Sequence, residues 1–299
     1  MPSVLRLLRP QQWVKNAFLF APLVFSKHLF DTAFFERELI AVGVFCLISS
    51  VVYIVNDIAD RESDRLHPVK RSRPIASGAI APTVAMGIGA CLLALGAYGA
   101  FWLGNRYALS LGVYFVLNLA YSFGLKQVML LDVFIIAAGF MLRVLAGTFA
   151  IGVPASPWLI LCTLFVSVFL AVSKRRAEIL LSIEQESELA RPVLKSYDLH
   201  FIDQMMTVSA SGMAISYALY TVAQRTVEVF GTENLIFTTV FVLFGIFRYL
   251  FLIRAHKTDD NPTHLLLSDL PMMLNVLAWF FVCVFIIYAE ASHTLSDIL

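Results

Sequence analysis

The chain has 299 residues, of which 59% are hydrophobic and 14% are charged, and its formal net charge is +1. A water-soluble protein of this length has no interior large enough to bury so much apolar surface, so the composition excludes a soluble globular protein. The mean hydropathy of +0.79 instead predicts an all-α integral membrane protein.

A bilayer core about 30 Å thick requires about 20 apolar residues in a helix. Nine segments meet this requirement approximately, and we expect them to form nine transmembrane helices in a single domain, residues 1–299. In chain order they are Trp13–Phe30, Leu39–Val55, Pro82–Leu103, Tyr107–Leu125, Val128–Val153, Trp158–Val172, Phe201–Ala223, Leu235–Ile253 and Leu270–Ala289. The first and sixth segments are short, so one of them could be tilted or re-entrant.

Lysine and arginine are distributed unevenly over the connecting loops. Alternate loops collect nearly all of them, and the opposite side receives only Lys27, Arg37, Arg106 and Arg225. Because cytoplasmic loops carry the excess of basic residues, we expect the N-terminus to be cytoplasmic and the C-terminus to lie outside. The three longest polar stretches, 56–81, 173–200 and 254–269, then all face the cytoplasm, and a function should be sought there.

An acidic segment, Asn56–Asp64, follows the second expected helix. Asp57, Asp60 and Asp64 are spaced i, i+3, i+7, so a continuous helix would place all three carboxylates on one face. Like charges at a helix C-terminus repel one another and the helix dipole, and a bound cation would offset both costs. Basic residues follow at once, namely Lys70, Arg71 and Arg73. This juxtaposition predicts a site for Mg²⁺ and a diphosphate.

The run NDxxDxxxD, followed by RxxPVKRSRPIASG, resembles the UbiA superfamily of intramembrane prenyltransferases. The resemblance implies a UbiA-like helical bundle with cytoplasmic active-site loops. It also implies that Asp57, Asp60 and Asp64 are catalytic metal ligands for Mg²⁺. Substrate contacts would come from Asn56, Lys70, Arg71 and Arg73.

The chain departs from prenyl-transferring members of this superfamily after the sixth expected helix. Those members carry a second acidic motif there, DxxxD, whereas this chain reads Ser173-Lys174-Arg175-Arg176-Ala177-Glu178. A basic loop suits a phosphate better than a second metal. The motifs RPxQWxKN, YSxxLK, LDxxxxxxGFxLR and SKRRAE resemble the phosphoribosyltransferase branch of the superfamily. This branch implies a catalytic role for Lys15, and substrate binding by Tyr121, Lys126, Arg143, Lys174, Arg175 and Glu178.

The resemblance to this branch implies a specific reaction. Phosphoribosyl pyrophosphate would donate 5-phosphoribose to a polyprenyl (decaprenyl) phosphate, with release of pyrophosphate, for a lipid-linked arabinose precursor of the cell envelope. We expect the enzyme in a bacterial inner membrane, with no nucleic-acid partner; the sequence does not specify polyprenol length or oligomeric state.

Two alternatives remain open from the sequence. One is a prenyltransferase with a second metal site built from Glu178, Glu184 and Asp198. The other is a transporter with an intramembrane Arg143, although the chain has no internal repeat of the kind that transporters usually contain.

Overall fold

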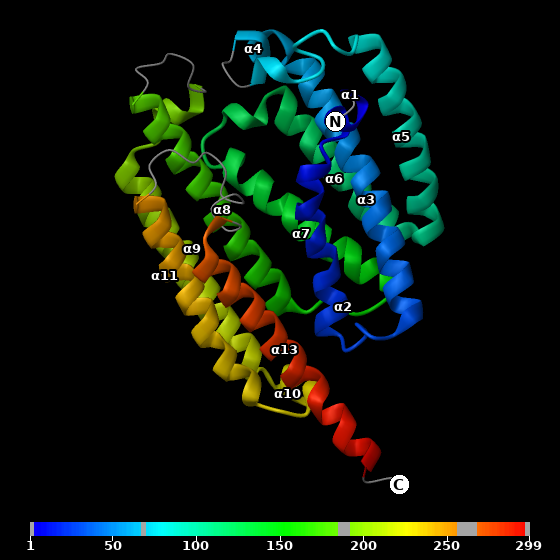
Figure 1. Ribbon diagram of the computed structural model, residues 1–299, viewed down its shortest axis with the longest axis vertical. Helices are drawn as coiled ribbons and strands as arrows, with labels where there is room; N and C mark the ends of the chain where they lie inside the picture. The colour runs from blue at the N-terminus through cyan, green and yellow to red at the C-terminus, as the bar shows by residue number, and fades with distance from the viewer. Residues whose placement is uncertain (1–2, 67–69, 185–191, 256–267, 297–299) are drawn as a thin grey trace. The chain divides into compact units, whose positions relative to one another are not determined.

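The structure is a computed structural model that describes residues 3–66, 70–184, 192–255 and 268–296, and these residues form helices and connecting segments without a strand. The chain divides into two compact units, Met1–Ala155 and Ser156–Leu299. Each unit is described by itself below (Figure 1). That residues 1–299 form a single domain stays a prediction.

Unit 1 is organised around one long helix, α3. Its elements in chain order are α1 (Ser3–Leu8), η1 (Pro10–Phe20), α2 (Ala21–Phe25), α3 (Thr32–Ala59), α4 (Arg61–Leu66), η2 (Lys70–Ser72), α5 (Pro82–Leu103), α6 (Asn105–Phe123), η3 (Leu125–Gln127) and α7 (Leu131–Ile151). Helix α3 packs against α5, α6, α7 and η1 (Figure 1). The largest buried side chains of this core include Phe45 on α3 and Tyr107 on α6.

Helix α3 carries the acidic motif at its C-terminal end. The side chain of Asp31 caps its first turn by accepting hydrogen bonds from the backbone N–H groups of Ala33 and Phe34, at 3.1 and 3.5 Å. The helix has 28 residues. It is therefore about 42 Å long, which exceeds the bilayer core of about 30 Å. The surplus length allows its last turns to reach beyond the hydrocarbon region.

The first expected span has an unusual conformation. Residues Pro10–Phe20 form a 3₁₀ helix of 11 residues, followed by the short helix α2. Such long 3₁₀ segments are uncommon because their hydrogen-bond geometry is poor. Polar contacts to α3 fasten this segment: Trp13 donates to Ser50 at 3.1 Å, and Asn16 donates to Ser49 at 3.3 Å.

A glycine allows η1 to approach α7 closely. A Cβ atom at Gly147 would lie 2.3 Å from the carbonyl oxygen of Leu19 and 2.8 Å from Oε1 of Glu38. No larger residue fits there without a shift of the backbone of η1. Gly147 thus determines how near the N-terminal segment lies to the core of unit 1.

Unit 2 contains the remaining helices. In chain order they are α8 (Pro157–Glu184), η4 (Pro192–Ser196), α9 (Leu199–Val222), α10 (Gln224–Phe230), η5 (Asn234–Thr238), α11 (Thr239–Ala255) and α13 (Leu270–Ser296). Helices α8 and α9 pack closely together, and α11 packs against α13. The hydroxyl of Tyr217 lies 2.6 Å from that of Thr238 and accepts a hydrogen bond from Trp279 at 2.8 Å, which joins α9, η5 and α13.

Six helical segments of the described residues are long and apolar enough to span a membrane. They are Thr32–Ala59, Pro82–Leu103, Leu131–Ile151, Pro157–Leu181, Asn234–Arg254 and Leu270–Tyr288. Each overlaps one of the nine expected spans. Helices α6 and α9 coincide with two more expected spans but carry more polar residues. An integral membrane protein is thereby supported, and the count of nine spans stays a prediction.

Candidate active site

The acidic motif lies where α3 ends and α4 begins. Helix α3 ends at Ala59, and the chain continues through Asp60 into α4, so the three aspartates do not share one uninterrupted helix. Asp57 and Asp64 are buried, at 1% and 3% exposure, whereas the side chain of Asp60 is 26% exposed. The sequence predicts that the three carboxylates share one face only if the helix is continuous. Because the helix is interrupted at Asp60, this residue is set apart from Asp57 and Asp64.

Two arginines compensate the buried carboxylates. Nη1 of Arg73 lies 2.6 Å from Oδ2 of Asp64 and 3.2 Å from Oδ1 of Asp57. Arg9 donates from Nη2 to the same Oδ1 of Asp57. Burial lowers the pKa of Arg9, and the charge of Asp57 opposes that effect. The site therefore combines two carboxylates and two guanidinium groups within hydrogen-bond reach.

Asp60 has a partner of its own. Nζ of Lys126, on η3, lies 2.7 Å from Oδ1 of Asp60. Tyr121 lies at the end of α6, close in the chain to η3, and is half-buried. The structure thus brings Lys126 within hydrogen-bond distance of the acidic motif.

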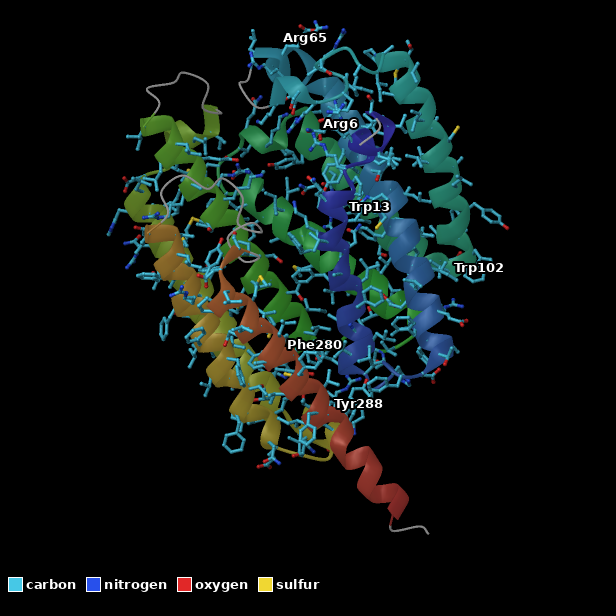
Figure 2. The ribbon with its side chains drawn as sticks, viewed as in Figure 1. Arg6, Trp13, Arg65, Trp102, Phe280 and Tyr288 are labelled. Atoms are coloured by element: carbon cyan, nitrogen blue, oxygen red, sulfur yellow. The ribbon has the colours of Figure 1, made fainter. Side chains whose placement is uncertain are left out.

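The basic segment after α4 also lies at this end of unit 1. Element η2 packs against α4, with Lys70 half-buried and Arg71 exposed. Figure 2 labels Arg65 beside α4 and Arg6 near α1, whereas Trp102 lies toward the opposite end of α5. Charge thus gathers at the end of unit 1 that carries Asp57.

Arg143 lies in a closed network inside unit 1. It is 5% exposed and donates to Asn16 and to the hydroxyl of Tyr114, both at 2.9 Å. Its guanidinium also lies 5.3 Å from the centre of the Phe45 ring. In the described structure Arg143 therefore ties η1 to α6 and α7, and Lys15 lies half-buried next to Asn16 on η1.

The basic residues of α8 form a separate group in unit 2. Arg175 is 1% exposed and pairs with Glu178, and Nζ of Lys174 lies 4.0 Å from Oε1 of the same carboxylate. The adjacent Arg176 contacts Asp203 on α9 at 2.8 Å. A cation thus lies against each of the two carboxylate oxygens of Glu178.

The donor set of the acidic motif suits a hard divalent cation. Oδ2 of Asp57 is buried and has no hydrogen-bond partner among the described residues. A carboxylate oxygen in that condition is a ready metal ligand, and Mg²⁺ typically takes one or two carboxylates together with water and substrate phosphate oxygens. No three acidic, histidine or cysteine side chains converge into a preformed metal centre in the part of the chain that the structure describes. The residues therefore fit a cation that shares its ligands with a phosphate.

Arg9 is the site residue that sequence reasoning missed. In the sequence Arg9 is the first residue of the RPxQWxKN motif, and nothing there links it to the acidic motif. Its backbone has φ 51° and ψ 57°, a left-handed conformation that few residues other than glycine adopt. That conformation cannot be read from sequence, and the partner of Arg9 lies 48 residues away.

The fold and the acidic motif define an intramembrane transferase class, and the chain belongs to the UbiA prenyltransferase family, whose model matches residues 20–269. Two relatives are called decaprenyl-phosphate phosphoribosyltransferase. The protein from Corynebacterium glutamicum is 37% identical over 96% of this chain and 87% of its own length. The protein from Mycolicibacterium smegmatis is 33% identical over 93% of this chain and 90% of its own length.

A solved structure shares the fold at low identity. A UbiA homolog from Archaeoglobus fulgidus bound to GPP and Mg²⁺ has a TM-score of 0.71 at 18% identity, covering 94% of this chain and 99% of that one. At this identity the likeness concerns the fold alone. The all-helical UbiA architecture expected from the sequence is thereby confirmed.

Proposed function

We propose that this chain transfers 5-phosphoribose from phosphoribosyl pyrophosphate to a polyprenyl phosphate, in a Mg²⁺-dependent reaction that releases pyrophosphate. The observation that carries the proposal is the pair of buried carboxylates, Asp57 and Asp64, which both accept hydrogen bonds from Arg73. Oδ2 of Asp57 has no hydrogen-bond partner among the described residues and is therefore available to a metal. Relatives named decaprenyl-phosphate phosphoribosyltransferase, which match nearly the whole chain, support the choice of donor and acceptor.

The acidic motif would hold the metal and the donor. Asp57, Asp60 and Asp64 are the proposed ligands, with Asn56 in support at the end of α3. When bound, Mg²⁺ withdraws negative charge from the diphosphate and so makes pyrophosphate a better leaving group. Arg73 would bind the diphosphate directly, because a guanidinium donates two parallel hydrogen bonds to phosphate oxygens.

The basic side chains around the motif would complete the diphosphate site. Lys70 and Arg71 lie on η2, beside α4, and add positive charge at the same end of unit 1. Charge fixed in place before the reaction lowers the barrier without reorganisation during it. The bond between ribose C1 and the pyrophosphate oxygen breaks, and a bond from C1 to the lipid phosphate oxygen forms.

The two remaining phosphates, on ribose C5 and on the lipid, need their own cations. The candidate cations are Lys15, Lys126 and Arg143 in unit 1, and Lys174 and Arg175 in unit 2. Tyr121 would donate a hydrogen bond to a phosphate oxygen, and Glu178 would orient Arg175, with which it pairs. The lipid acceptor is already an anion, so no general base is required. These residues would act by positioning and by electrostatic stabilisation.

A prenyl transfer is the second candidate, and the contacts of α8 argue against it. Its second metal site would need Glu178, Glu184 and Asp198. Glu178 is paired with Arg175 and Lys174, and Asp198 is exposed before the first turn of α9; the side chain of Glu184 lies outside the described residues. A cation lies against each oxygen of Glu178, whereas Oδ2 of Asp57 has no hydrogen-bond partner among the described residues, so Glu178 is the poorer metal ligand.

We further propose that the enzyme works at the cytoplasmic face of a bacterial inner membrane, where it would serve lipid-linked arabinose synthesis.

The proposal is tested with membranes that contain the expressed chain. Incubation with phosphoribosyl pyrophosphate labelled in the ribose, decaprenyl phosphate and Mg²⁺ should move the label into the lipid fraction. Membranes that express Asp57→Asn provide the control for background transfer. If no label enters the lipid and the membranes instead transfer a prenyl group from a prenyl diphosphate to an aromatic acceptor, this proposal is wrong. The chain would then be a prenyltransferase.

A further inference from the structure

The carboxylate that suits a metal best is already held by arginine. Arg9 and Arg73 both donate to Oδ1 of Asp57, and Arg73 also holds Asp64. Oδ2 of Asp57 is buried and has no hydrogen-bond partner in the described part of the chain. The two guanidinium groups therefore supply the charge compensation that a divalent cation would otherwise provide.

A metal at Asp57 competes with both arginines through charge. Mg²⁺ binds oxygen at 2.0–2.1 Å with near-ideal octahedral geometry, so its ligands and waters need the space around the carboxylate. A dication on Oδ2 repels the guanidinium groups that lie within hydrogen-bond distance of Oδ1 of the same carboxylate. This repulsion weakens the contacts of both arginines with Asp57 when the metal binds.

Arg9 is the arginine more easily displaced. Arg73 contacts two carboxylates, whereas Arg9 contacts one. Arg9 also has a left-handed backbone conformation, which residues other than glycine rarely adopt. The contact with Asp57 is therefore made from a strained backbone.

The surroundings of Arg9 keep its side chain near the site after release. Its guanidinium lies 5.3 Å from the centre of the Tyr53 ring, one helical turn before Asp57. The side chain is 21% exposed, so it also reaches the accessible side of the motif. A guanidinium in this position can contact a diphosphate that shares a metal with Asp57.

We propose that Arg9 is a metal-displaced diphosphate ligand: it holds Asp57 while the acidic motif has no metal, and it moves to the donor's diphosphate when a divalent cation takes that carboxylate. This inference rests on the proposed function. It assigns opposite effects to one side chain, since Arg9 competes with the metal alone and assists the metal and diphosphate together.

The test compares Arg9→Gln with the full-length wild-type protein in detergent. Mn²⁺ serves as the metal probe, and its free fraction is measured by electron paramagnetic resonance without any phosphate compound. Loss of the competing cation should tighten Mn²⁺ binding at least roughly threefold, equivalent to about 0.7 kcal/mol. With Mn²⁺ saturating, the affinity for inorganic pyrophosphate, measured by calorimetry, should fall roughly tenfold or more.

Arg6→Gln is the matched control. Arg6 lies three residues earlier on α1, is exposed, and its removal changes the net charge equally. This variant should leave both affinities within about twofold of wild type because a distant exposed charge is screened by salt. If Arg9→Gln does not fold, Arg9→Lys keeps the charge and should show the same loss of pyrophosphate affinity, because lysine lacks the planar fork.

Each outcome decides the proposal. Mn²⁺ affinity that is unchanged or weakened in Arg9→Gln overturns the competition, and unchanged pyrophosphate affinity overturns the role in diphosphate binding. Equal effects in Arg6→Gln would reduce both to general electrostatics and also overturn it. Neither measurement requires turnover. If the wild-type assay yields no labelled lipid, the proposed function is wrong, but the Mn²⁺ comparison still tests the role of Arg9.

Discussion

Asp57 combines two properties that rarely occur together in one carboxylate. It is almost fully buried, and one of its oxygens accepts from two arginines while the other has no partner among the described residues. The charge of a buried carboxylate must be compensated by a nearby cation, and burying a carboxylate oxygen without a hydrogen-bond partner costs free energy. The arrangement is therefore explained better by a ligand that binds there than by a purely structural ion pair.

Asp57→Asn should abolish Mn²⁺ binding and lower phosphoribosyl transfer at least about 100-fold, since even the loss of an outer-shell partner of a metal costs 10–100-fold. Glu62→Gln is the matched control on the neighbouring helix. The side chain of Glu62 is 76% exposed and pairs with Arg65 at 3.3 Å on the surface, where such pairs contribute about 0–1 kcal/mol. Transfer by this control should stay within about twofold of wild type. An equal loss in both variants would mean that the motif acts through general charge.

Glu38 presents a second buried carboxylate, far along α3 from the acidic motif. It is 0% exposed, and neither of its oxygens has a hydrogen-bond partner in the described ranges. An ionised carboxylate costs more to bury than a neutral amide of the same shape. Glu38→Gln should therefore keep the melting temperature or raise it, by about 2–4 °C for each kcal/mol gained.

The measurement is differential scanning fluorimetry in detergent, with Glu36→Gln as the control. Glu36 is exposed two residues earlier on the same helix, and its variant should melt as the wild type does. A large decrease confined to Glu38→Gln would contradict this prediction and indicate that the charge itself is needed.

The charged residues of the site were only partly accessible to sequence reasoning. The contacts of Asp57, Asp64 and Arg73 follow from their nearness in the chain. Arg9 and Lys126 reach the motif only through tertiary packing, of η1 against α3 and of η3 against α6 and α7, across 48 and 66 residues. Basic residues near a membrane surface are also expected from the positive-inside rule alone. Their presence in the sequence therefore does not indicate which carboxylates they contact.

At the scale of the element, apolar segments predicted helix ends well only where a local end signal coincides with the end of the segment. The expected span Pro82–Leu103 matches α5 residue for residue, because Pro82 begins the helix and Gly104, with φ 129°, ends it. The expected span that ends at Val172 is too short, since α8 continues to Glu184 through charged residues that favour helix. The 3₁₀ form of η1 was not predictable, because contacts with α3 and α7 fasten it.

The close approach of η1 to α7 gives a prediction for the element. Gly147→Ala would bring a methyl group within 2.3 Å of the Leu19 carbonyl. The resulting shift of η1 should destabilise the protein by about 1–3 kcal/mol. Gly87→Ala is the control: nothing lies within 4 Å of a Cβ there, on α5. Gly87→Ala should be neutral or stabilising by up to about 1 kcal/mol. The melting temperatures of the two variants are compared, and equal melting temperatures would contradict the packing argument.

At the scale of the whole molecule, apolar helices and the uneven loop charges predict an orientation. Residues Ala79 and Asn105 are exposed and bracket α5, which has 22 residues. Its length of about 33 Å suffices to cross a bilayer. The acidic motif lies at the end where α5 begins.

Single cysteines at these two positions test the orientation. In intact cells a membrane-impermeant maleimide should label Asn105→Cys, and it should label Ala79→Cys only after the membrane is permeabilised. The native cysteines set the background, which is measured on the unmodified chain. The reverse pattern would invert the topology, and equal labelling of both positions would show that α5 does not cross.

The tie between Asn16 and Arg143 has a consequence for biosynthesis. The two residues are separated by 127 positions, and Arg37 on α3 likewise donates to the carbonyl of Ala150, 113 positions later. At a synthesis rate of about 5–20 residues per second, the ribosome needs roughly 6–25 seconds to produce the second partner. During that interval Asn16 lacks one of its partners, and the N-terminal segment cannot adopt its final depth in the core. The order of synthesis therefore makes α7 the element that completes unit 1, and chains truncated before it should be substrates for membrane quality control.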